Sequence, residues 1–233
     1  MNIRKNKAYT MAEILIVMAI FAIAMTLLIR TIVRVDPDKN KILFIKAYHA
    51  TEEILALSMN DETLYDQNIY TKADITNWEG EKHFNLADAP LKDAEITFIN
   101  NGERKKACHS GCDENLTKNN APCYHIARYI NTIGPVNCNA SNATDMNMRT
   151  SNGVCYYGWT AAGLGDTTSS GSTQKSFDAV IDPSCSRSAD NKSGYAVRVY
   201  ASGAMEIPEE SDLTIKANQE RALQWLKSPT TVD

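Results

Sequence analysis

One carboxylate beside an apolar stretch is the most informative chemical feature of the sequence. Glu13 directly precedes the run from Ile14 to Ile29, in which Thr26 is the only polar residue. An ionised group within a membrane-spanning segment costs on the order of 2.5–3.5 kcal/mol at mid-bilayer by insertion scales, so such groups usually have a partner. Tyr9 lies four residues before Glu13, one helical turn away on the same face. If the chain is cut after Ala8, the new amine of Tyr9 can pair with Glu13 of the same chain or of a neighbouring subunit.

The cysteines are the second group of residues with a chemical signature. Residues 1–107 contain none, and all six lie in the following 78 residues: Cys108, Cys112, Cys123, Cys138, Cys155 and Cys185. An even number of cysteines clustered in an exported domain indicates disulfides, with fifteen pairings open. The alternative is a zinc site, because His109 and His125 lie close in sequence to the first three cysteines. The spacings, however, are not those of a zinc finger or ribbon, and disulfides are expected.

The sequence contains none of the common catalytic motifs, so we expect no enzyme and no cofactor. A Gly-x-Ser-x-Gly elbow, a His-Glu-x-x-His pair and a phosphate-binding loop are all missing. Calcium is the one ion considered, because Asp178, Asp182 and Asp190 lie close in sequence, although their spacing matches no dedicated calcium loop. The net charge of -4 and the short basic runs argue against a nucleic-acid partner.

The N-terminal residues read as a leader followed by a membrane helix. Residues 1–8 carry three basic residues and no acidic one. The sixteen residues from Ile14 to Ile29 rise about 24 Å as a helix, and the hydrocarbon core is about 30 Å thick. Inclusion of residues 9–13 provides the missing length. We therefore predict a leader over 1–8, a transmembrane and assembly helix over 9–35, and an amphipathic helix over 36–60 that starts at Asp36-Pro37.

This N-terminal pattern resembles the class III signal of type IV pilins and type II secretion pseudopilins. The resemblance covers about residues 1–33 and rests on the basic leader, on Tyr9-Thr10, on Glu13 and on the long apolar run after it. It implies that a prepilin peptidase cuts between Ala8 and Tyr9 and that Tyr9 becomes N-methylated. It also implies that Glu13 recruits the next subunit through that subunit's terminal amine.

The sequence departs from the usual pilin pattern at two positions, of which the first concerns cleavage and the second favours a minor or pseudopilin-type subunit. Ala8 stands where the family usually has Gly, and Arg30 stands where many major pilins have a helix-kinking Pro. The implied partners are prepilin peptidase, other pilin or pseudopilin subunits, the inner-membrane assembly platform and membrane lipid. The implied location is the bacterial inner membrane, with one membrane pass, an extracytoplasmic C-terminal domain, and a pilus or pseudopilus after assembly. Some major pseudopilins bind calcium in a C-terminal loop, as considered above.

Two other interpretations of the N-terminal residues stay open. An ordinary secretory signal peptide is one, because Ala22-Ile23-Ala24 fits a small-x-small cleavage site. A cut there would leave an apolar stub on the mature chain. An uncleaved signal anchor is the other, and it would make the protein a permanently membrane-anchored binding domain, an adhesin or a receptor, that does not polymerise.

For the whole chain we predict an α+β fold in which the long N-terminal helix packs on a small antiparallel sheet. Residues 61–233 form the extracytoplasmic domain, stapled by disulfides and closed by a helix over 212–227. Strands are predicted over 95–99, 124–133, 154–157, 177–182, 195–200 and 205–207. A hairpin is expected at Asn100-Asn101-Gly102 and another at Ser202-Gly203. The Gly-, Ser- and Thr-rich residues 158–176 are predicted to form a mobile surface loop.

Overall fold

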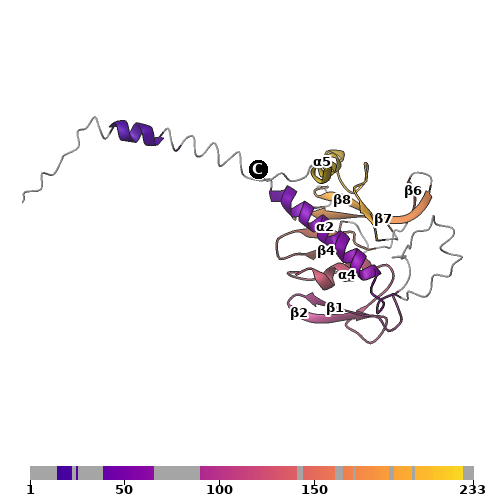
Figure 1. Cartoon of the computed structure of the whole chain (residues 1–233). Helices are drawn as coiled ribbons and strands as arrows, with labels where there is room; N and C mark the ends of the chain where they lie inside the picture. Colours follow the sequence, from indigo (N-terminus) through magenta and orange to yellow (C-terminus); the bar gives the residue numbers. More distant parts are fainter. Residues whose placement is uncertain are drawn as a thin grey trace, which may run out of the picture. The chain divides into compact units, whose positions relative to one another are not determined.

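The fold is α+β, and its described parts fall into two compact units (Figure 1). A computed structural model describes residues 15–22, 25, 39–65, 90–140, 144–160, 165–169, 172–188, 192–200 and 203–227. The units comprise residues 1–39 and 40–233, and each is described by itself.

The first unit contains a short apolar helix over residues 15–22. Its large side chains are exposed, from Ile16 and Phe21 at 60% to Leu15 at 67%. Within the described residues, no helix has both the length and the apolar character needed to cross a bilayer. Most of the predicted transmembrane segment over 9–35 lies outside those residues, including Ile14 and Ile29, the first and last residues of its apolar run.

The second unit begins with α2 (Lys39–Met59), within the predicted amphipathic helix; residues 36–38 lie outside the described part. One face of α2 is buried, and its members recur three or four residues apart, as an amphipathic helix requires. The buried residues are Phe44, Ala47, Tyr48, Thr51, Ile54, Leu55, Ser58 and Met59. This face anchors α2 on the sheet: Tyr48 donates a hydrogen bond to the Met205 carbonyl at 3.0 Å, and the rings of Phe44 and Tyr195 lie 4.6 Å apart.

The larger sheet is antiparallel and has the order β4-β5-β7-β8-β9. The strands are β4 (Met146–Arg149), β5 (Cys155–Tyr157), β7 (Ser172–Asp182), β8 (Tyr195–Tyr200) and β9 (Met205–Glu206). The strands predicted over 154–157, 177–182, 195–200 and 205–207 are confirmed within a few residues. Successive side chains of a strand point to opposite faces of the sheet. Ala196 and Val197 of β8 are both fully buried, so both faces of the sheet are covered at this point.

The prediction of a loop over 158–176 is wrong for its second half. β6 (Gly165–Ser169) pairs with the first half of β7, from Gly165 opposite Ser176 to Ser169 opposite Ser172. Thr is favoured in strands, and the two residues between the strands are Ser170-Gly171, outside the described part. Residues 165–169 and 172–176, although rich in polar side chains, therefore form a strand pair and not a loop.

A second, three-stranded sheet has the order β1-β2-β3. The predicted hairpin joins β1 (Glu95–Asn100) to β2 (Glu103–Cys108), and both turn residues have positive φ, 52° at Asn101 and 82° at Gly102. Asn-Gly is the sequence that such a turn favours. β3 (Glu114–Asn115) pairs parallel to β2. The described residues thus form two sheets, one of them mixed, where a single antiparallel sheet was predicted.

The prediction of a strand over 124–133 is also wrong, because α4 (Ala121–Tyr129) occupies its first part. β-prone residues such as Tyr124 and Ile126 suggested the strand. Pro122 in the first helical turn is the stronger signal, since proline there lacks only an N–H that would be unpaired anyway. The helix buries Cys123 and Ile126, three residues apart.

The predicted closing helix is confirmed as α5 (Lys216–Lys227), four residues shorter than expected at its start. Trp225 on this helix lies against the α2–β8 contact, with ring centroids 5.1 Å from Tyr195 and 6.1 Å from Phe44. The N-terminal half of α2, β8 and the end of α5 therefore share one aromatic core.

Candidate functional site

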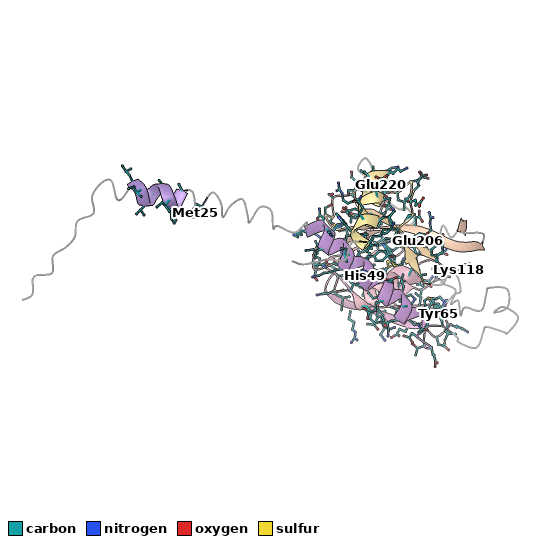
Figure 2. All side chains as sticks on the ribbon, turned by 45° about the horizontal axis from the view of Figure 1, so that its top comes forward. Met25, His49, Tyr65, Lys118, Glu206 and Glu220 are labelled. Atoms are coloured by element: carbon teal, nitrogen blue, oxygen red, sulfur yellow. A yellow bond between two sulfur atoms is a disulfide. The ribbon has the colours of Figure 1, made fainter. Side chains whose placement is uncertain are left out.

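The predicted processing and assembly residues form the first candidate site. The structure does not describe Ala8, Tyr9 and Glu13. The described part of the same segment is the helix over residues 15–22 together with Met25, which is 45% exposed (Figure 2). A helix that is apolar all round requires lipid or other helices around it, so this segment can serve as a membrane or assembly element.

The six cysteines form three disulfides, which confirms the expected oxidation state and resolves the pairing. The pairs are Cys108–Cys112, Cys123–Cys138 and Cys155–Cys185, and no cysteine is free. All pairs are local, with sequence separations of 4, 15 and 30. Each therefore fixes one loop to a neighbouring element: the loop after β2, the residues after α4, and the residues after β7.

Asp182, at the end of β7, organises the loop that Cys185 belongs to. Its buried carboxylate accepts hydrogen bonds from the N–H groups of Ser184, Ser186 and Arg187 at 2.9–3.0 Å and from the hydroxyls of Ser184 and Ser193 at 2.7 and 2.8 Å. Burial alone would raise the pKa of this carboxyl. The hydrogen bonds, those of Ser184 and Ser193 first, outweigh burial and lower the pKa below its usual value.

Arg187 extends this loop toward β5 and the start of α5. Its guanidinium donates to the carbonyl oxygens of Ser193 at 2.8 Å and Leu213 at 2.7 Å, and it lies 5.8 Å from the centre of the Tyr157 ring. Sequence reasoning missed this role, because a loop arginine has no periodic signal. The loop between β7 and β8 is consequently a built structure with a buried acid at its centre.

The acidic residues considered for calcium are engaged by protein groups where they are described. Asp178 pairs with Arg198 at 2.8 Å and accepts a hydrogen bond from Ser211 at 3.1 Å. Asp182 is surrounded by the donors given above, and Asp190 lies outside the described residues. In the described part of the chain, no group of three or more His, Cys, Asp or Glu residues is placed to hold a metal ion. Calcium binding stays an untested prediction.

The histidine of α4 is a further buried titratable group. His125 Nε2 and the Tyr65 hydroxyl are hydrogen-bonded at 2.8 Å, and Nδ1 has no hydrogen-bond partner. Burial, with a smaller contribution from the nearby Arg128, lowers the pKa of His125 to about 3. The imidazole is therefore neutral at physiological pH and ties the end of the α2 region to α4.

Comparison with known proteins bears on the N-terminal segment. The family described as prokaryotic N-terminal methylation motif matches residues 3–29. The chain carries a prepilin-type signal. The match includes Ala8, Tyr9 and Glu13 and confirms the resemblance to the N-termini of type IV pilins and pseudopilins. No curated protein and no solved structure shows significant similarity to the chain, so the disulfide-bonded part is described by its own structure alone.

Proposed function

We propose that this protein is a structural subunit of a type IV pilus or a type II secretion pseudopilus. The observation that carries the proposal is the methylation motif over residues 3–29. In this proposal a prepilin peptidase of the bacterial inner membrane removes residues 1–8 and exposes the amine of Tyr9. Other pilin or pseudopilin subunits and the inner-membrane assembly platform are its further partners. The subunit is a minor or pseudopilin-type one, as Arg30 suggests.

Assembly uses the apolar helix and Glu13. Before assembly, lipid covers the apolar side chains of residues 15–22 and Met25, which lie exposed in the isolated chain. In the filament, the same side chains of neighbouring subunits replace the lipid. Glu13 pairs with the Tyr9 amine of the adjacent subunit, since an ion pair in an apolar surrounding fixes register where apolar contacts alone do not.

The disulfide-bonded unit is the exposed part of the subunit. Three disulfides suit an extracytoplasmic compartment, where they form and persist. α2 follows the N-terminal segment in sequence, and its buried face packs within the disulfide-bonded unit. The assembly helix is therefore covalently connected to this unit through α2. The proposed role is structural and involves neither a catalytic centre nor a cofactor.

Leader removal is the first experiment. The full chain is expressed with and without a prepilin peptidase, and the N-terminus is determined by mass spectrometry. The expected result is a peptidase-dependent product that starts with N-methylated Tyr9. A chain that keeps Met1 would overturn the proposal and leave a permanently anchored binding domain. A product that starts after Ala24 would indicate an ordinary signal peptide.

Incorporation into filaments is the second experiment. Glu13→Ala is expected to be cleaved normally and to be lost from sheared filaments by at least about tenfold, because the recruiting ion pair is gone. Glu53→Ala is the matched control, since Glu53 is an exposed carboxylate on α2 with no role in the proposed pairing. Equal incorporation of the Glu13 variant and the control would refute the pairing.

A further inference from the structure

The three disulfides differ in how far solvent reaches them. Cys123, Cys138 and Cys155 are at most 1% exposed. Cys108 and Cys112 are both partly exposed, and they form the one pair in which neither partner is buried. A surface depression of about 290 Å³ lies over this pair and is lined by the loop 108–112 together with Glu114 and Asn115. A small thiol can therefore reach these sulfurs without any opening of the core.

The loop that the Cys108–Cys112 disulfide closes is also held by other bonds. The N–H of Lys106 donates to the Asp113 carboxylate at 2.9 Å, and the N–H of Leu116 donates to the Cys108 carbonyl at 2.8 Å. β2 and β3 pair directly on either side of the loop, with Cys108 opposite Asn115. Leu116, which follows, is fully buried. The base of the loop is consequently fixed whether or not the disulfide is present.

The length of the closed loop also indicates that Cys108–Cys112 contributes little to the stability of the fold. In the chain-entropy description, a disulfide stabilises a fold more when it closes a longer loop. The separation of 4 compares with 15 and 30 for the other pairs. Counted with both cysteines, the closed loops contain 5, 16 and 31 residues. By this scaling, loss of Cys108–Cys112 changes the folding equilibrium about sixfold less than loss of Cys123–Cys138, and about fifteenfold less than loss of Cys155–Cys185.

The surroundings of Cys108 suit a thiol. Its sulfur lies 3.1 Å from the carbonyl oxygen of Ser110. A disulfide sulfur has no hydrogen to share with this oxygen, whereas a Cys108 S–H can donate to it. Gly111, with a φ of 83°, supplies the turn that brings this carbonyl back toward the sulfur. Reduction therefore adds a hydrogen bond inside the loop.

The geometry points to Cys108–Cys112 as a thiol–disulfide exchange site for an external dithiol, separate from the two structural disulfides. A thiolate of the dithiol forms a bond to Cys112 Sγ, the Cys108–Cys112 bond breaks, and Cys108 leaves as a thiolate that takes a proton from water. The second thiol of the dithiol, as a thiolate, then attacks the first sulfur of the dithiol, which is bonded to Cys112 Sγ. The mixed disulfide breaks, and Cys112 leaves as a thiolate. Two electrons pass to the protein, and the dithiol becomes a cyclic disulfide. This site does not depend on the proposed pilin-like role.

Timed reduction of the oxidised full chain in detergent tests the site. Dithiothreitol is added under native conditions, samples are alkylated at intervals, and the labelled cysteines are identified by peptide mass spectrometry. Cys108 and Cys112 are expected to be labelled at least about tenfold faster than the other four, since buried disulfides react only through opening of the structure. Simultaneous loss of all three disulfides, or earlier loss of another one, would overturn the proposal.

Two further measurements separate an exchange site from a structural bond. The variant Cys108→Ser/Cys112→Ser should fold, and its two remaining disulfides should react as slowly as in the parent chain; faster reaction would show that the first disulfide supports the fold.

Thioredoxin without its second active-site cysteine is the protein probe. It should be trapped on Cys112. Trapping on Cys108 would reverse the assigned direction of attack, and no trapping would refute exchange with a protein dithiol.

Discussion

The side-chain amide of Gln219 hydrogen-bonds both backbone polar groups of Ala196. Gln219 Oε1 accepts from the Ala196 N–H at 2.9 Å, and Nε2 donates to the Ala196 carbonyl at 3.1 Å. β9 pairs with β8 only at Arg198 and Val199, so Ala196 has no strand neighbour on that side. One side chain of α5 thus takes the place of a strand neighbour at Ala196 and joins the closing helix to β8 of the larger sheet.

The first prediction follows from this replacement. Gln219→Leu leaves the N–H and the C=O of Ala196 buried without partners, and each unpaired buried group costs about 1–3 kcal/mol. We expect a loss of about 3 kcal/mol in the free energy of unfolding, measured by urea denaturation. Gln224→Leu on the same helix is the matched control, because Gln224 is exposed, and it should change stability by less than about 0.5 kcal/mol. Equal effects would contradict the proposed role of Gln219.

The second prediction concerns the carboxylate that organises the loop after β7. Asp182→Asn removes the charge that accepts five hydrogen bonds, and hydrogen bonds to charged groups contribute about 1.5–3 kcal/mol each. We expect at least about 2 kcal/mol of destabilisation and faster proteolysis after residue 183. Asp178→Asn is the control, since its partly exposed pair with Arg198 should contribute about 1 kcal/mol or less.

The stabilising effect of Asp182 also depends on pH. The pKa of this carboxyl is lower in the folded chain than in the unfolded one, so its contribution is complete above the unfolded value, about 3.9. It is lost as the pH falls from there through the lower folded value. The parent and Asp182→Asn chains should therefore converge in stability in strong acid. A constant difference down to pH 2 would contradict this assignment.

The sequence predicted the elements whose signals are local. The periodic apolar residues of α2 and the turn at Asn101-Gly102 each lie within one short segment, and both were predicted with nearly the observed bounds. The two wrong predictions arose where local signals conflict. The β-prone residues from Tyr124 onward outweighed the helix-start signal of Pro122, although α4 begins at Ala121. The Ser- and Thr-rich composition was interpreted as a loop, although these residues form the pair of β6 and β7.

Contacts between distant segments could not be predicted. The bond between Gln219 and Ala196 joins residues 23 apart, and the hydrogen bond between Tyr65 and His125 joins residues 60 apart. The pairing of the six cysteines is local, with separations of 4, 15 and 30, but fifteen pairings were open and cysteine spacing alone did not choose among them. The N-terminal signal is the opposite case, because the family comparison recognises the motif over residues 3–29 without any tertiary structure. The roles of Ala8, Tyr9 and Glu13 within it stay predictions.

The third prediction concerns the residue before the expected cut. Ala8→Gly restores the residue usual in the family that the N-terminal segment resembles. We expect leader removal to become severalfold faster in a timed assay with a prepilin peptidase, followed by gel mobility. Ala12→Gly is the control, because it makes the same change after the cut and should leave the rate unaltered. If Ala8→Gly is cleaved no faster than the parent chain, the peptidase does not discriminate at this position.

The fourth prediction is a pH-dependent loss of stability caused by His125. The pKa of this buried imidazole is about 3 in the folded chain, against about 6.5 in the unfolded chain. The unfolded chain therefore binds the extra proton first as the pH falls below 6.5, and stability declines by about 1.4 kcal/mol per pH unit until the folded value is reached.

His125→Gln keeps a group that can bond Tyr65 but does not titrate. Urea denaturation at pH 7.5, 6.5, 5.5 and 5.0 should show a decline for the parent that the variant lacks. Asp61 and Asp182 are both ionised in the folded chain over this range, because their pKa values are lowered. Parallel pH profiles would show that His125 is not the titrating group.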